Sequence, residues 1–216
     1  MSTYITWFEI AAFLASLAAW GIIRRSPSLR LFPLLLLLIA GVEAYESFFR
    51  TSHGGSNAWL YNWQVPAQHL LYLLILYYAI ERPAAKKTLL IFIAALLVFL
   101  PLSGLFFTTK GRFNGVGYCF GSILVVIGII MKFYEMLQNP SDFNFLRKPF
   151  FYMLFAFLLF NLGSLPYFAM GNWLYFTIGY KDAVLILVRV MSILNYILYG
   201  TYTIAFIWIL QRKAYS

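Results

Sequence analysis

Charged residues are scarce in this chain. Only 11% of its 216 residues are Asp, Glu, Lys or Arg, seven of them are acidic, and 62% of the chain is hydrophobic. A water-soluble domain of this size needs much more polar surface than this composition offers. The sequence therefore excludes a soluble enzyme or binding domain and indicates an integral membrane protein.

Cysteine and histidine are also rare. Cys119 is the only cysteine, so no internal disulfide can form, and we interpret it as a small packing residue. His53 and His69 are the only histidines, with no repeated spacing between metal-binding residues. His69 with Glu43 and Glu46 could supply three zinc ligands, but this pattern alone is weak. We therefore predict no metal and no cofactor.

Long apolar runs are what the chain has in abundance. Runs of about 20 apolar residues are typical of membrane-spanning helices. The seven predicted spans cover residues 4–23, 31–49, 62–81, 88–107, 115–137, 149–170 and 183–210. Because the connections between them are short, we predict that residues 1–216 form a single all-α, seven-helix transmembrane domain.

The basic residues fall mainly on one side of these spans, after the odd-numbered ones. That side holds Arg24, Arg25, Arg30, Arg82, Lys86, Lys87, Lys132, Arg147, Lys148, Arg212 and Lys213, and the other holds Arg50, Lys110, Arg112 and Lys181. Cytoplasmic loops carry the excess of Lys and Arg. We therefore expect the N-terminus outside and the C-terminus in the cytoplasm, in the plasma (inner) membrane. The net charge of +9 then indicates contact with lipid headgroups and not with nucleic acid.

Two short similarities hint at an internal repeat. Ser26-Pro27-Ser28 resembles Asn139-Pro140-Ser141, and Trp59-Leu60-Tyr61 resembles Trp173-Leu174-Tyr175. The matches would relate spans one to three to spans five to seven, with span four as an extra helix. A 3+1+3 parallel repeat of this kind occurs in receptors and in small transporters, so it does not decide function.

Three prolines lie toward the predicted outer ends of spans. Pro66, Pro101 and Pro166 fall in or near spans three, four and six. Proline kinks there would splay the helices and open an outward-facing cavity. The alternative is that each proline simply ends its helix.

Ionisable residues inside the spans are the most informative feature. Such residues are costly in a membrane and mark functional sites. At a rise of 1.5 Å per residue, the ionisable groups and Asn161 lie about 5 to 12 Å from the outer helix ends, whereas Asn195 lies deeper, toward the midplane. This shared level predicts a polar pocket open to the outside. The predicted ligand-binding residues are Glu9, Glu43, Glu46, Gln68, His69, Asn161, Arg189 and Asn195.

Arg189 is the only cation of this set that keeps its charge under all ordinary conditions, so it requires a carboxylate partner. We expect that partner to be Glu43 or Glu46, with Glu9 as the alternative. Three acids and one arginine leave at least one acid over, which is protonated or binds a cationic or hydrogen-bonding ligand. A purely structural ion pair between spans two and seven is the competing interpretation.

Four functions fit this pattern. The main hypothesis is a receptor or sensor-like protein that binds a small molecule or lipid and acts through a protein partner, because the cytoplasmic segments are too short for an output domain. A small secondary transporter of the 3+1+3 type is the first alternative. A structural subunit of a membrane complex and an intramembrane enzyme acting on lipid are the others, although no nucleophile is evident, so we do not expect an enzyme.

Overall fold

The computed structural model of the chain describes residues 3–49, 57–106, 112–138 and 145–214. This part of the chain is helical, with no β-strand, which confirms the all-α prediction. The α-helices are α1 (Thr3–Ala18), α2 (Trp20–Ile23), α3 (Phe32–Ala44), α4 (Ala58–Ala79), α5 (Pro83–Phe106), α6 (Gly115–Gln138), α7 (Pro149–Ile178) and α8 (Tyr180–Ala214). The 3-10 turns η1 (Leu29–Leu31) and η4 (Phe145–Arg147) precede α3 and α7, and the π-helix η2 (Tyr45–Phe49) follows α3.

Four helical segments are long and apolar enough to cross a membrane. They are α5, α6, residues Pro149–Met170 of α7 and Val184–Gln211 of α8. Many large apolar side chains on the outer helix faces are exposed, including Val98 at 63%, Ile193 at 60% and Ile204 at 67%. Lipid is the environment in which such surfaces are stable. The chain is therefore a membrane protein.

The other three predicted spans are helical but do not form one long apolar α-helix each. The first is divided between α1 and the single turn of α2. The second runs continuously from Leu29 to Phe49 but changes from 3-10 to α to π form. α4 has 22 residues, and its first half carries polar residues such as Gln64, Gln68 and His69. The α-helices α1 and α3 are thus apolar but short, whereas polar cavity-side residues lower the apolar character of α4.

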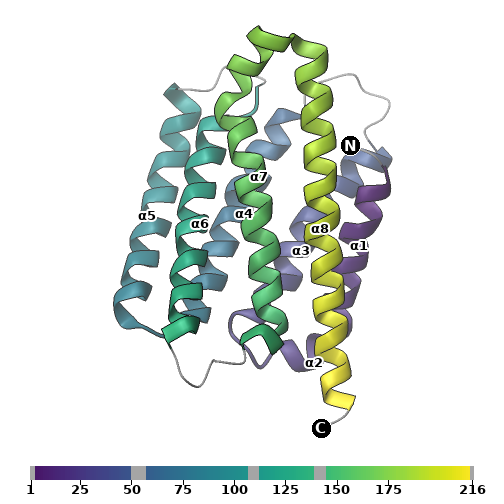
Figure 1. Cartoon of the computed structure of the whole chain (residues 1–216), viewed down its shortest axis with the longest axis vertical. Helices are drawn as coiled ribbons and strands as arrows, with labels where there is room; N and C mark the ends of the chain where they lie inside the picture. The colour runs from purple at the N-terminus through teal and green to yellow at the C-terminus, as the bar shows by residue number, and fades with distance from the viewer. Residues whose placement is uncertain (1–2, 50–56, 107–111, 139–144, 215–216) are drawn as a thin grey trace.

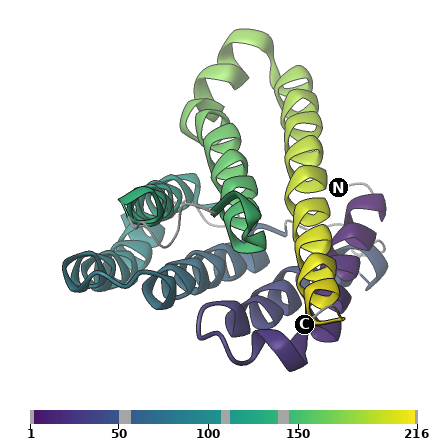
Figure 2. The same cartoon turned by 60° about the horizontal axis from the view of Figure 1, so that its bottom comes forward.

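Six long helices form a closed ring. Each packs against the next in the order α1, α3, α4, α6, α7, α8, and α8 returns to α1. Helix α5 packs only on the outside of this ring, against α4 and α6, and lies at the edge of the molecule in Figure 1 and Figure 2. Its buried residues Leu89, Leu96 and Ser103 recur every seven positions, so only a narrow stripe of α5 contacts the bundle.

The hairpin of α7 and α8 projects beyond the ends of the other helices, as Figure 1 shows. These helices have 30 and 35 residues, about 45 and 52 Å at the α-helical rise, against a hydrocarbon thickness of about 30 Å. Gly179 alone separates them, with φ 85° and ψ 158°. This conformation is essentially restricted to glycine, which explains the residue at the turn.

Five of the eight prolines occupy two kinds of position in the helices. Pro33 and Pro149 lie in the first turns of α3 and α7, where a missing N–H costs little. Pro66, Pro101 and Pro166 lie inside α4, α5 and α7, and each of these helices continues past its proline. The interpretation that these three prolines end their helices is therefore wrong.

Candidate functional site

A cavity of about 610 Å³ lies inside the helix ring. All six ring helices contribute to its lining, and α5 does not. Exposed Asn57 at the start of α4 and exposed Val188 near the start of α8 place its opening toward the end of the bundle where the α7–α8 hairpin projects. A cavity of this size suits a drug-sized molecule.

Six of the eight sequence-predicted binding residues line this cavity. They come from α1, α3, α4, α7 and α8, and all but one are deeply buried. The six are Glu9, Glu43, Gln68, His69, Asn161 and Asn195. The shared depth predicted from helix lengths therefore corresponds to one place in the structure, while their role in binding remains a prediction.

Two carboxylates lie on the α1 and α3 side of the cavity. Glu9 is 1% exposed and Glu43 is 6% exposed, and the two interact electrostatically. The Tyr61 hydroxyl donates a 2.9 Å hydrogen bond to Oε1 of Glu43. Oε2 of Glu9 is buried with no hydrogen-bond partner in the described part of the chain. Glu9 is thus a buried acid to whose Oε2 atom the described residues supply no partner.

His69 occupies the α4 and α6 side. Its Nε2 atom lies 3.2 Å from the Ser122 hydroxyl, and its Nδ1 atom is buried without a partner among the described residues. The ring fits directly against Gly121, where an added Cβ would lie only 2.6 Å from Nδ1. It also meets the edge of the Tyr118 ring, with 5.6 Å between ring centroids. These contacts fix the imidazole in one position at the cavity wall.

Three buried amides complete the polar lining. Oε1 of Gln64 has no partner within the described residues, whereas Nδ2 of Asn161 donates to the Phe157 carbonyl oxygen at 2.8 Å. Asn195 is 3% exposed and lines the cavity from α8. Tyr118, which the sequence analysis did not select, is held by a 2.6 Å hydrogen bond between its hydroxyl and that of Ser164.

Aromatic and apolar side chains form the rest of the lining. Phe157, Phe160 and Phe168 come from α7, and Tyr118 packs against Phe168 with 4.2 Å between ring centroids. Met191 and other apolar residues of α8 add to this surface. The cavity therefore has an acidic side on α1 and α3 and an aromatic side on α6 and α7, which lie across the ring from each other.

The inner end of the cavity is closed. The buried hydroxyls of Tyr72 and Tyr202 share a 2.9 Å hydrogen bond one helical turn beyond the lining residues His69 and Tyr199. The Tyr72 ring stacks on Phe157 with 3.3 Å between ring centroids. Below them the buried core continues through residues such as Leu76, Ile129, Met153 and Phe206. The structure thus shows a pocket and not a channel.

Glu46 and Arg189 do not line the cavity. Glu46 belongs to the π-helix η2, is half-buried and accepts a 3.2 Å hydrogen bond from Nδ2 of Asn57. The spacing of Glu43, Glu46 and Arg50 would put them on one face of a regular α-helix, but the π-helix changes that register. Arg50 lies outside the described residues.

The expected pairing of Arg189 is corrected by the structure. Arg189 is exposed and forms no ion pair with a described carboxylate. The α8 residues that line the cavity, among them Val184, Leu187 and Met191, define one face of the helix, and at 100° per residue Arg189 lies on the opposite face. The cavity therefore has acidic groups without the arginine that was expected to balance them.

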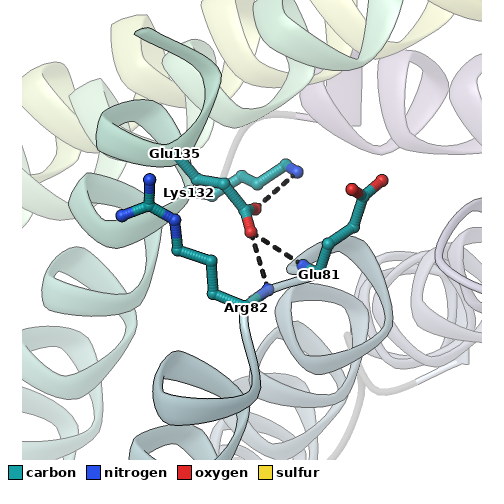
Figure 3. Close-up of polar contacts among 4 residues, drawn as sticks. All are labelled: Glu81, Arg82, Lys132 and Glu135. Atoms are coloured by element: carbon teal, nitrogen blue, oxygen red, sulfur yellow. Dashed lines mark hydrogen bonds and ion pairs between the residues drawn. The ribbon is translucent and has the colours of Figure 1, made fainter. Parts of the chain in front are cut away.

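A second polar cluster, missed by the sequence analysis, joins α5 and α6 (Figure 3). Buried Glu135 accepts hydrogen bonds from the backbone N–H groups of Glu81 and Arg82, at 2.9 and 2.8 Å, and pairs with Nζ of Lys132 at 2.9 Å. Both N–H groups immediately precede α5, so the carboxylate caps its N-terminus. Arg82 also donates to Gln138. This cluster is structural, and the i, i+3 spacing of Lys132 and Glu135 was its only signal in the sequence.

No group of three His, Cys, Asp or Glu side chains suited to a metal ion occurs among the described residues. The considered zinc site of His69, Glu43 and Glu46 is therefore not assembled. Comparisons of the chain with known protein families, with curated proteins and with solved structures gave no match. The function must be argued from the cavity alone.

Proposed function

We propose that this protein is a receptor or sensor-like membrane protein that binds a small molecule or lipid in the ring cavity and acts through a partner protein. The observation that carries this proposal is the set of buried, unpartnered polar atoms on one cavity of about 610 Å³: Oε2 of Glu9, Oε1 of Gln64 and Nδ1 of His69. Buried polar groups normally have partners, and each unsatisfied one is costly. A bound ligand supplies such partners.

The proposal places the protein in the plasma membrane, which it crosses seven times. Its N-terminus then lies outside the cell and its C-terminus in the cytoplasm. The position of the basic residues supports this orientation. Most of them lie just after α2, at the starts of α5 and α7 and at the end of α8, and these segments lie toward the lower end of the molecule in Figure 1. The cavity would then open to the outside, and the basic end would face the cytoplasmic partner.

The closed inner end of the cavity favours binding over transport. A transporter needs a route from the site to each side of the membrane. Here Tyr72, Tyr202 and Phe157 seal the inner end, and the core below them is apolar. A receptor needs only the outer opening, with the ligand acting on the helices around it.

The order of helices in the ring favours a transporter as the second candidate. If the ring is rotated by three helix positions, α1 takes the place of α6, α3 that of α7 and α4 that of α8. Helix α5 then has no counterpart and is the extra helix. This order fits the 3+1+3 repeat, and alternating-access proteins are often built in this way. Uptake of the cavity ligand into sealed proteoliposomes would favour the transporter, and binding without uptake would favour the receptor.

Native mass spectrometry of the gently purified protein tests the proposed function. Wild type is compared with Glu43→Gln and with Glu46→Gln, the matched control because Glu46 does not line the cavity. We expect a discrete extra mass on wild type and Glu46→Gln that Glu43→Gln loses. If no variant retains a mass and all melt alike, the buried acids are structural and the proposed function is wrong.

A further inference from the structure

The described lining of the proposed binding cavity includes two acids and one histidine. Glu9 and Glu43 are both buried, and the lining residues include no lysine or arginine. Two buried carboxyl groups near each other are unfavourable when charged, because desolvation and mutual repulsion act together. A positively charged ligand removes both penalties at once.

The hydrogen-bonding groups of the cavity also indicate a ligand that donates. Tyr61 is the one described side chain that donates a hydrogen bond to either acid, and it serves Glu43. Oε2 of Glu9 and Oε1 of Gln64 are acceptors without a donor in the described chain. An ammonium group carries up to three donors and accepts nothing, which matches this excess of acceptors.

The opposite side of the cavity suits an apolar body. Tyr118, Phe157, Phe160 and Phe168 present aromatic surface from α6 and α7, across the ring from the two acids. Apolar pockets with few polar groups bind amphiphilic molecules by burying the apolar part and orienting the polar end. Aromatic faces also attract cations directly.

Other ligand classes fit less well. An anion would be repelled by Glu9 and Glu43, and a neutral lipid or alcohol would supply no counter-charge to either acid. An inorganic cation would neutralise the charge of the two acids but would leave most of the cavity of about 610 Å³, including its aromatic side, unoccupied. The size, the acids and the aromatic side together require a molecule with a cationic end and an apolar body.

Resting on the proposed binding function, we propose that the ligand is an organic amine. Its ammonium group binds between Glu9 and Glu43, and its apolar body contacts the Tyr118 and Phe157 side of the cavity. Gln64 accepts a further hydrogen bond from the same ammonium group. The specificity of the site is therefore set by charge at one end and by aromatic surface at the other.

The test measures binding of matched probes to the full chain in an uncharged detergent by isothermal titration calorimetry. The amines are butylamine, benzylamine and tryptamine, each beside its alcohol and carboxylate counterparts: butanol and butyrate, benzyl alcohol and benzoate, tryptophol and indoleacetate. We expect the aromatic amines to bind at least about tenfold more tightly than their alcohols, as for close charge pairs, and the carboxylates not to bind.

Two variants locate the effect. Glu9→Gln should lose the preference for amines, whereas Glu81→Gln, which removes an exposed acid at the other end of the bundle, should keep it. Thermal melting confirms that each variant is folded, and the comparison of head groups on wild type stands even if Glu9→Gln does not fold.

Three results would overturn the assignment. If the alcohols bound as tightly as the amines, the cavity would select its ligands by shape alone and not by charge. Stabilisation by sodium chloride equal to that by the amines would assign the acids to an inorganic cation. Binding by none of the amines would exclude this ligand class. In each case a retained mass lost from Glu43→Gln would leave the proposed binding function intact, so the two failures are distinguishable.

Discussion

Gly121 of α6 lies directly against the imidazole of His69 in α4, so closely that a Cβ at position 121 would lie 2.6 Å from Nδ1. The absence of a side chain at this position allows His69 to reach Ser122 and line the cavity. The pair Gly117 and Gly121 therefore serves packing inside the bundle, where Asn114 and His69 occupy the space above the two glycines.

Gly121→Ala should consequently displace His69 and lower the free energy of unfolding by about 1–3 kcal/mol, the usual cost of overpacking. Thermal melting in detergent measures this loss. Gly104→Ala is the matched control, since its Cβ would meet nothing within 4 Å and alanine favours the helix. Equal melting of the two variants would show that His69 is not held by this contact.

Glu135→Gln should weaken the attachment of α5 to the ring. The substitution leaves buried Lys132 without its charged partner and weakens the cap on the Glu81 and Arg82 N–H groups. Breaking a buried ion pair from one side costs about 3 kcal/mol, which melting curves resolve. Glu81→Gln, on an exposed side chain of the same cluster, should melt like wild type. A Glu135→Gln protein as stable as wild type would contradict the capping role.

Much of the helical arrangement could be predicted because its cause is visible in the sequence. Apolar runs fix where helices form, and the distance of a residue from a helix end fixes its depth. Depth alone brought Glu9 in α1, His69 in α4 and Asn161 in α7 to one level, where the structure places them on one cavity. No tertiary contact had to be known for that inference.

The direction in which each residue points was harder to predict. In α8 the polar spacing of Arg189, Ser192, Tyr196, Tyr199 and Thr203 is typical of one inward face, with Asn195 near its edge. Only Tyr199 and Asn195 of these line the cavity, together with the apolar residues Val184, Leu187, Val188 and Met191. Apolar side chains suit both the lipid and the aromatic part of the cavity, so polarity does not identify the inner face here. The π-helix at Glu46 and the capping role of Glu135 depend on tertiary structure in the same way.

Arg189→Ala should therefore change stability little, within about 0.5 kcal/mol, as expected for an exposed side chain without a buried partner. A buried pair with Glu43 or Glu46, as expected from the sequence, would instead give a loss of about 1–4 kcal/mol. Melting in detergent separates the two expectations. A large loss would mean that Arg189 does balance a buried acid, and it would remove the charge argument for an amine ligand.

Gly179→Ala should strain the turn between α7 and α8. Gly179 has φ 85° and ψ 158°, a conformation that costs other residues about 1–3 kcal/mol. Because α8 begins at the next residue and supplies Val184 to the cavity lining, relief of this strain would shift the rim of the cavity. We expect lower thermal stability and weaker amine binding in Gly179→Ala. In the control Gly200→Ala, whose Cβ would meet nothing within 4 Å, both should stay at the wild-type level. Wild-type melting of Gly179→Ala would show that the turn accepts an ordinary backbone conformation.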